Sequence, residues 1–479
     1  MSGRVRDVGS LARHEARVGH DLACLNYPPA DWVPESIGPD GRPMLDVLVV
    51  GAGMCGQTAA FGLRREGIGR LRIIDRNPEG EEGPWATYAR MEMLRSPKQL
   101  TGPDLGIPSL TFRAWYEAQY GRDGWDALYK VWRLDWRDYL LWVRRQVGLQ
   151  VENRTSLRAV VAEAGRLRVT IDHTARPRES ETLYVRKVVL ALGREGSGAV
   201  RWPRFASLDP VAAQASGRLF HSSDDFPFAR CSGLRVGVLG VGASGFDNAA
   251  RALEANASAV TLFARRHRLP QVNKSKSTSF AGYFRGFSSL DDARRLRIYR
   301  YIFDEQTPPP FESVLRCDRH ANFEVRLGQP WVDVAVSDAG VVVTTPFGRH
   351  DLDAVILATG FDVNLADRPE VRTLAADAMT WGDRVPDAGE LAPFPYLGDG
   401  FELIGRTAGS QPLLKDIHLF NWGSTVSHGG LSGDIPGIGQ GVNRLANALV
   451  RDLFVADADR HYEALLRHEE LELAPTRFA

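Results

Sequence analysis

The sequence is poor in cysteine. Its 479 residues contain only four, Cys24, Cys55, Cys231 and Cys317, with neither a CxxC pair nor the spacing of zinc ligands. We therefore expect no disulfide framework and no metal site, and the pattern favours a reducing, cytoplasmic setting. The same absence counts against the disulfide reductases, which need a redox-active cysteine pair.

The sequence also has few lysines, no net charge and no long apolar run. Six of the 59 basic residues are lysines, and 59 acidic residues bring the formal net charge to zero. A neutral chain has no bulk attraction to nucleic acid or to an anionic membrane surface. No apolar run reaches the roughly 18 residues of a membrane-spanning helix, and the N-terminus lacks the apolar core of a secretory signal. We expect small-molecule partners, and the sequence leaves the oligomeric state open.

Two glycine-rich elbows stand out against these absences. LDVLVVGAGMCG and LRVGVLGVGASG each run from a short apolar strand into a helical pattern. In a GxGxxG elbow the first glycine permits the turn, the second lets a pyrophosphate approach the backbone, and the third lets helix and strand pack closely. The helix N-terminus then offers free N–H donors to the phosphates. The predicted phosphate-binding residues are Gly51, Gly53 and Gly56 in the first elbow and Gly240, Gly242 and Gly245 in the second.

The strands that follow the two elbows end differently. Asp75 ends the first, 24 residues past the first glycine, with Arg76 next to it. The equivalent position after the second elbow is Ala264, followed by Arg265 and Arg266. A carboxylate binds free ribose hydroxyls and repels a 2′-phosphate, whereas guanidinium groups hold that phosphate with charge-assisted hydrogen bonds. The first site therefore suits FAD and the second NADPH.

The order of these segments predicts an α/β fold with two dinucleotide-binding, Rossmann-like domains. We expect an irregular N-terminal extension at residues 1–43. An FAD-binding domain would comprise residues 44–205 and 350–479, and an NADPH-binding domain, residues 206–349, would be inserted within it. The apolar strands ending in ALG (191–193) and ATG (358–360) repeat at the scale of these domains.

Several side chains are candidates for the cofactors and the chemistry. Gly433 and Asp434, at a predicted helix N-terminus, suit the pyrimidine end and ribityl chain of a flavin. Arg95 and Lys98, in LRSPKQLT, could stabilise negative charge on the reduced ring, and His428 could hydrogen-bond to it. Lys274 is a candidate for the NADPH phosphates.

At this point the chain resembles the class B flavoprotein monooxygenases, which include flavin-containing, N-hydroxylating and Baeyer–Villiger enzymes. The matching stretches are GAGMCG, EGEEGPW with Trp85, GRLFHSS, GVGASGFD with Ser244, and ATGF with Thr359. The resemblance assigns Trp85 to the FAD site, and Ser244 and Thr359 to the NADPH site. It implies that NADPH reduces FAD and that O₂ forms a C4a-(hydro)peroxyflavin, which transfers one oxygen atom to a small-molecule substrate.

One departure from the family bears on the reaction. The Baeyer–Villiger fingerprint FxGxxxHxxxW keeps Gly217 and His221 but has Ala215 and Asp225 at its aromatic positions. This favours N- or other heteroatom hydroxylation, with amines as the first substrate class to consider. Baeyer–Villiger oxidation, an NADPH oxidase or dehydrogenase without oxygen insertion, and a nucleotide-binding protein without catalysis remain alternatives.

Overall fold

The first elbow begins the larger of two sheets that contain parallel strands. The computed structural model describes residues 6–174, 179–473 and 475–478. In this sheet the strand order is β2-β1-β5-β4-β3, and β14 pairs with β5. Strand β5 runs parallel to β1 and β14 and antiparallel to β4. The strands are β1 (Leu45–Val50), β2 (Leu71–Ile74), β3 (Thr155–Glu163), β4 (Arg166–His173), β5 (Ser180–Leu190) and β14 (Ile417–Leu419).

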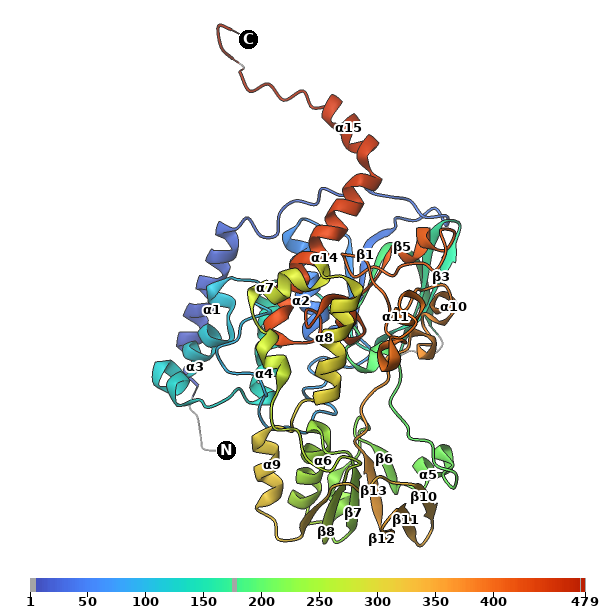
Figure 1. The fold of residues 1–479 in the computed structure, drawn as a ribbon. Coiled ribbons are helices and arrows are strands. Elements are labelled where there is room, and N and C mark those ends of the chain that lie inside the picture. Colours follow the sequence, from blue (N-terminus) through green and yellow to red (C-terminus); the bar gives the residue numbers. More distant parts are fainter. Residues whose placement is uncertain (1–5, 175–178, 474, 479) are drawn as a thin grey trace.

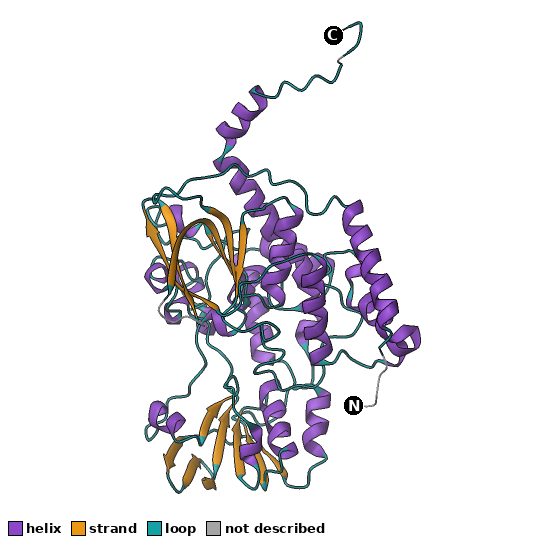
Figure 2. Ribbon diagram, turned by 180° about the vertical axis from the view of Figure 1, so that it is seen from behind, coloured by secondary structure: helices purple, strands orange, loops and turns teal. Residues whose placement is uncertain are grey.

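The second elbow begins a separate sheet of five parallel strands, in the order β6-β13-β7-β8-β9. Figures 1 and 2 show it apart from the first sheet, beside a small antiparallel sheet of β10, β11 and β12. The strands are β6 (Leu219–His221), β7 (Arg235–Leu239), β8 (Ala259–Phe263), β9 (Phe323–Arg326), β10 (Asp333–Ser337), β11 (Gly340–Thr345), β12 (Gly348–Leu352) and β13 (Ala354–Leu357).

Strand β13 shows that the expected boundary after residue 349, between the NADPH-binding and FAD-binding parts, was placed too early. Its residues pair in register with β6 and β7, for example Ala354 with Val236. Residues 354–357 therefore lie in the second sheet, although the sequence assigned everything after residue 349 to the FAD-binding part. The reason is that an apolar strand ending in glycine fits either sheet equally well, and only the pairing partner distinguishes them.

Helices cover the sheets, and two of them explain how the first elbow is held. Ten of the twelve residues of α2 are buried. A Cβ on Gly62 of α2 would lie 2.3 Å from Cγ1 of Val442, so a glycine is needed where α2 and α14 cross. The longer helices are α2 (Met54–Arg65), α3 (Phe112–Ala127), α4 (Arg133–Gln146), α6 (Ala243–Glu254), α8 (Asp292–Glu305), α9 (Phe311–Asp318), α14 (Ile435–Ala456) and α15 (Ala458–Leu466).

Apart from α1, described below, the remaining α-helices are short. Figure 1 places α15 on an arm that projects from the molecule. Within the described ranges no helix combines the length and the apolar character needed to cross a bilayer. The short helices are α5 (Pro210–Ala215), α7 (Ala281–Gly286), α10 (Arg372–Ala375), α11 (Trp381–Arg384), α12 (Gln411–Leu414) and α13 (Thr425–His428).

Part of the expected irregular extension at residues 1–43 is a helix instead. Helix α1 (Val8–Cys24) begins at Asp7, whose carboxylate accepts a hydrogen bond from the N–H of Ser10. It contacts α3 and α4, and it buries Val18 and Leu22 in the aromatic core that those helices share. The proline clusters that indicated irregular chain lie after this helix, so the prediction was wrong for residues 8–24.

This packing makes α1 part of the folding unit. Leu22 is 5% exposed and Leu25, one residue past the helix, is 53% exposed. We expect Leu22→Ala to lower the free energy of unfolding by about 2–4 kcal/mol through lost burial and a residual cavity. The matched change Leu25→Ala should cost less than about 0.5 kcal/mol. Urea unfolding followed by tryptophan fluorescence measures both, and equal effects would mean that α1 is not docked.

Candidate functional site

The first elbow has the close backbone contacts that a dinucleotide cradle requires. Gly51 has φ of 95°, and a Cβ there would lie 2.7 Å from the carbonyl oxygen of Ala191. A Cβ on Gly56 would lie 1.7 Å from the carbonyl oxygen of Gly51. Gly53 caps α2 without a side-chain hydrogen bond, so the first N–H groups of the helix are left for an anion. These features fit the pyrophosphate of FAD.

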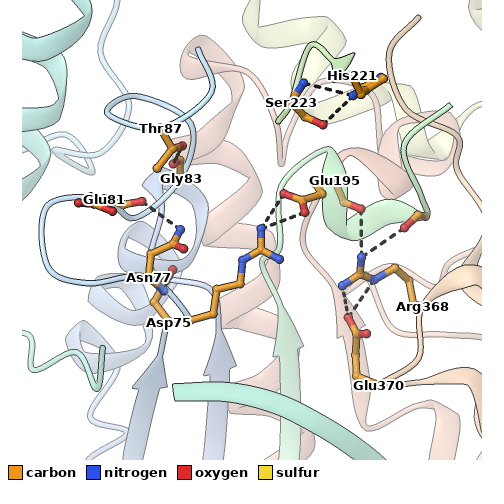
Figure 3. Close-up of polar contacts among 12 residues, drawn as sticks. Asp75, Asn77, Glu81, Gly83, Thr87, Glu195, His221, Ser223, Arg368 and Glu370 are labelled. Atoms are coloured by element: carbon orange, nitrogen blue, oxygen red, sulfur yellow. Dashed lines mark hydrogen bonds and ion pairs between the residues drawn. The ribbon is translucent and has the colours of Figure 1, made fainter. Parts of the chain in front are cut away.

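Asp75, which directly follows β2, hydrogen-bonds to the backbone of this elbow. Its Oδ2 accepts a hydrogen bond of 2.8 Å from the N–H of Ala52, and its Oδ1 accepts one of 2.8 Å from Asn77 (Figure 3). The carboxylate is buried, and desolvation raises its pKa. Asp75 therefore has two backbone donors in addition to any ribose hydroxyl that it would bind.

Arg76 is occupied by a protein partner. Its Nη2 donates to both carboxylate oxygens of Glu195, at 2.9 and 2.8 Å. Arg368 donates to the carbonyl oxygens of Glu195 and Gly198, both at 3.3 Å, so the turn that follows β5 is held from two sides (Figure 3). Arg76 thus fixes the edge of the predicted FAD site, and its direct contact with FAD stays a prediction.

The EGEEGPW stretch, which the resemblance associates with FAD, packs against the first elbow. A Cβ on Gly53 would lie 3.4 Å from Cα of Gly83, which brings the two backbones together. The buried Nε1 of Trp85 has no hydrogen-bond partner in the described part of the chain. An unpaired buried donor is costly unless a ligand accepts from it, so Trp85 also fits a bound FAD.

The second elbow repeats the geometry of the first. Gly240 has φ of 114°, and a Cβ there would lie 2.5 Å from the carbonyl oxygen of Ala358. A Cβ on Gly245 would lie 2.0 Å from the carbonyl oxygen of Gly240, whereas a Cβ on Gly242 would meet nothing within 4 Å. The open space at Gly242 and the exposed Ser244 at the start of α6 leave room for a second pyrophosphate.

The basic residues expected around the second nucleotide are not equally available. Arg265 is exposed and has no hydrogen-bond or ion-pair partner within the described ranges. Arg266 donates through Nη2 to the carbonyl oxygen of Asp304 at 3.0 Å. Lys274 lies 5.4 Å from the ring of Tyr301, and its hydrogen bond to that phenol raises the pKa of the lysine. Arg265 is therefore the cation that is free to meet a 2′-phosphate.

Thr359 has a different contact from the one expected. Its hydroxyl donates to the carbonyl oxygen of Arg201 at 2.5 Å, on the segment that enters the second sheet. A neighbouring bridge pairs Val200 with Phe361. Thr359 therefore joins the two chain segments that connect the sheets, and any contact with NADPH would be additional.

Arg95 lies in a charged cluster with two residues at the end of the first sheet. Asp434 begins α14, and its carboxylate makes no hydrogen bond with the described part of the chain. Desolvation raises the pKa of Asp434, while the charges of Arg194 and Arg95 oppose the rise. Arg194 stands 3.7 Å over the ring of Trp422. Arg194 and Asp434 are both solvent-accessible, and each lies close enough to influence the charge of the other.

Arg95 closes this cluster from the loop after EGEEGPW. Its Nη1 donates to the carbonyl oxygen of Pro308 at 2.8 Å, and desolvation lowers its pKa. Gly433 is exposed immediately before Asp434. The arrangement places two guanidinium groups, an unpaired carboxylate and the N-terminus of α14 together, which fits the polar end of a flavin and an adjoining substrate.

Lys98 and His428 are not brought into this cluster. Lys98 donates to the carbonyl oxygen of Trp125 at 2.5 Å and lies 4.8 Å from its ring. The Nε2 of His428 is 2.9 Å from the carbonyl oxygen of Gly398, and its Nδ1 is 3.1 Å from Nη1 of Arg444. Burial and the charge of Arg444 lower the pKa of His428 to about 3, so the ring is neutral with both nitrogens engaged.

Sequence reasoning missed Arg194 and gave Asp247 no role beyond its place in a motif. Arg194 directly follows the strand that ends in ALG, where a parallel sheet presents ligand-binding side chains, so its position was the available indication. Asp247, the last residue of GVGASGFD, is buried and accepts a hydrogen bond of 2.5 Å from Ser313. Its carboxylate lies 3.9 Å from Nη1 of Arg316.

Comparison with known proteins agrees with this geometry. A family profile described as FAD-NAD(P)-binding matches residues 48–195, and one described as L-lysine 6-monooxygenase/L-ornithine 5-monooxygenase matches residues 127–304. The FAD-dependent urate hydroxylase of Xanthomonas campestris pv. campestris is 38% identical over 472 residues, which cover 97% of each chain.

Solved structures share the fold at lower identity. Ornithine hydroxylase from Pseudomonas aeruginosa has a TM-score of 0.66 at 17% identity, covering 86% of this chain and 100% of that chain. L-lysine 6-monooxygenase from Pseudomonas syringae has a TM-score of 0.62 at 18% identity, covering 85% and 99%. The chain therefore belongs to the class B flavoprotein monooxygenases, as its motifs indicated. It is an enzyme, a flavin-dependent monooxygenase that binds FAD and a nicotinamide dinucleotide.

The burial of Asp247 has a measurable consequence. Desolvation raises its pKa to about 6, so the native protein favours the protonated carboxyl and loses stability as pH rises through that value. We expect Asp247→Asn to raise the thermal midpoint more at pH 7.5 than at pH 5, by about 1–3 °C. The control is Asp318→Asn on the exposed end of α9, which should shift both midpoints equally. A pH-independent effect of Asp247→Asn would contradict the raised pKa.

Proposed function

We propose that this enzyme is an FAD- and NADPH-dependent hydroxylase that acts on urate. The observation that carries the substrate is the 38% identity, along 97% of the chain, to a protein described as FAD-dependent urate hydroxylase. In this proposal the unit around the first sheet binds FAD. A unit of about residues 199–360, around the second sheet, binds NADPH and is inserted in the first.

The chain's own residues would divide the work as follows. Bound FAD supplies hydride acceptance and the activation of O₂, chemistry that no side chain provides. The Gly51–Gly56 elbow and the N-terminus of α2 hold its pyrophosphate, and Asp75 holds its ribose. The N-terminus of α14 places a positive dipole end where negative charge collects on the reduced ring, and Asp434 binds the ribityl hydroxyls.

The cluster beside α14 suits a substrate of this kind. Urate is a planar weak acid with several carbonyl oxygens, and it is anionic at neutral pH. Arg95 and Arg194 offer planar, permanently charged donors that match such an edge. The Cζ of Arg194 already lies 3.7 Å from the centre of the Trp422 ring, a contact that restricts where its guanidinium can move. Arg95 is partly buried, which strengthens its attraction for an anion, whereas Arg194 stays solvent-accessible.

Hydroxylation of an amine nitrogen is the second candidate. The profile described as L-lysine 6-monooxygenase/L-ornithine 5-monooxygenase matches residues 127–304. In this candidate the carboxylate of Asp434 would receive the ammonium group of the substrate instead of the ribityl hydroxyls. The two candidates differ in the charge that the site must recognise.

Preference for NADPH is tested at Arg265. Arg265→Ala removes the free guanidinium at the end of β8, so we expect KM for NADPH to rise about 10-fold or more while KM for NADH changes less than about twofold. Arg166→Ala, at the exposed start of β4, is the matched loss of a surface arginine and should change neither value. An equal rise for both nucleotides would refute the 2′-phosphate assignment.

The substrate is tested by comparing urate with L-ornithine and L-lysine in steady-state turnover with product quantified. We expect product from urate, and a fall in kcat/KM of about 10- to 100-fold in Arg95→Gln with partial recovery in Arg95→Lys. Lys98→Met is the control, since that side chain meets the carbonyl of Trp125. Product from an amine and none from urate would favour the second candidate, and an equal loss in Lys98→Met would mean that the loop, not Arg95, matters.

A further inference from the structure

A cavity of about 870 Å³ lies away from the α14 cluster and shares none of its residues. It is bounded by the loop 86–92, the start of α4, the turn 226–228, and helices α6 and α9. This volume is in the range of small-molecule sites. Its charged and aromatic lining residues are Arg90, Arg133, Arg251, Arg316, Glu92, Asp135, Tyr120, Trp132, Phe226 and Phe228.

Four arginines line this cavity, and they differ in whether a carboxylate pairs with them. Arg316 forms an ion pair of 2.8 Å with Glu254, and Arg251 reaches the same carboxylate at 3.4 Å. Desolvation, and then repulsion by neighbouring guanidinium groups including Arg90, lowers the pKa of Arg133. Glu92 and Asp135 also line the cavity, and Asp247 lies 3.9 Å from Arg316. Within the described residues neither Arg90 nor Arg133 has a carboxylate at ion-pair distance, so these two guanidinium groups are the ones left for an anion.

The N-terminus of α4 adds to the positive electrostatic potential of the cavity. Helix α4 has 14 residues, and its N-cap, Trp132, provides no side-chain hydrogen bond. Trp132, Arg133, Leu134 and Asp135 all line the cavity, so the positive end of the helix opens into it. Asp135 lies in the first turn, where the helix itself favours its charge. An anion entering the cavity would meet this helix end together with the guanidinium groups.

The apolar part of the lining is aromatic and adjoins these charges. The ring of Phe228 has the Cζ of Arg90 at 5.4 Å and that of Arg251 at 5.9 Å from its centroid. Phe226 lies 4.6 Å from Phe228, centroid to centroid, and Trp132 lines the same space. A ligand with a flat apolar body and a negatively charged group would satisfy both parts of the lining.

The cavity is separate from the two nucleotide sites. Arg251 lies in the last turn of α6, eight residues and about 12 Å along the axis from the N-terminus at which the second nucleotide is expected. On the loop 86–92, Tyr88 turns the other way, with its ring 6.2 Å from Phe361. The charge of Arg194 acts on the pKa of Tyr88, so the side of the loop that carries Tyr88 faces the α14 cluster.

We propose that this cavity binds a planar aromatic carboxylate, with Arg251, Arg90 and Arg133 holding the carboxylate against Phe228 and Trp132. Arg133 also donates to the carbonyl oxygens of Trp85 and Met91, so the ligand would contact the loop that leads from the FAD site. The site is independent of which substrate the enzyme oxidises.

The test is calorimetric titration of the FAD-loaded enzyme, saturated with NADP⁺, with 2-naphthoate. We expect saturable binding, weakened about 10-fold in Arg251→Gln and more in Arg251→Glu. Arg294→Gln is the matched control, because Arg294 pairs with Asp291 at the same i,i+3 spacing as Arg251 with Glu254 but lines none of this cavity. The neutral 2-naphthamide should bind at least about tenfold more weakly than the carboxylate.

Three results would overturn the proposal. They are no binding of 2-naphthoate by the wild-type enzyme at millimolar concentration, affinity in Arg251→Glu within twofold of wild type, and equal binding of the amide and the carboxylate. Unchanged NADP⁺ affinity and thermal midpoint in Arg251→Gln would show that the loss is local. Displacement of bound NADP⁺ by 2-naphthoate would instead place the ligand in the nucleotide site and also contradict the separate cavity.

Discussion

Both nucleotide elbows depend on one constraint, the contact of a glycine with a carbonyl oxygen of a neighbouring parallel strand. Gly51 meets the carbonyl of Ala191, and Gly240 meets that of Ala358. No side chain fits between them, and both glycines have positive φ values. The contact explains why each elbow is followed, more than a hundred residues later, by an apolar strand ending in alanine, one residue and glycine.

A second theme is a series of opposite charges that runs from α14 to α6 and α9. Asp434 at α14 feels Arg194 and Arg95, and Arg95 in turn feels Asp247 on α6. Asp247 is held by Ser313 and lies near Arg316 on α9. Opposite charges thus alternate from α14 to α6 and α9. Because desolvation strengthens such interactions, replacing one member will alter its neighbours.

Much of the fold could be predicted from the sequence because strands, elbows and their chemistry are local patterns. The mixed α/β architecture and the flavin monooxygenase family are confirmed. The placement of β13 could not be predicted, since pairing partners are a tertiary property. Helix α1 was missed because the proline clusters after it dominated the interpretation of the whole segment.

In the candidate site, too, the sequence could not predict tertiary contacts, here those of individual side chains. Sequence proximity grouped Arg95 with Lys98, but only Arg95 lies in the charged cluster, while Lys98 turns to the carbonyl of Trp125. His428 stands in the expected loop, yet both ring nitrogens are already engaged. Position along the chain predicts which loop reaches the flavin, and packing decides which side chains of that loop face it.

The central claim is that oxygen from O₂ is inserted into urate at the expense of NADPH. The most direct measurement is mass spectrometry of the product formed from urate and NADPH under ¹⁸O₂ by the FAD-loaded enzyme. The account predicts one ¹⁸O atom in the product, with product formed in proportion to the NADPH consumed. NADPH consumption that yields only hydrogen peroxide, with urate recovered unlabelled, would contradict it.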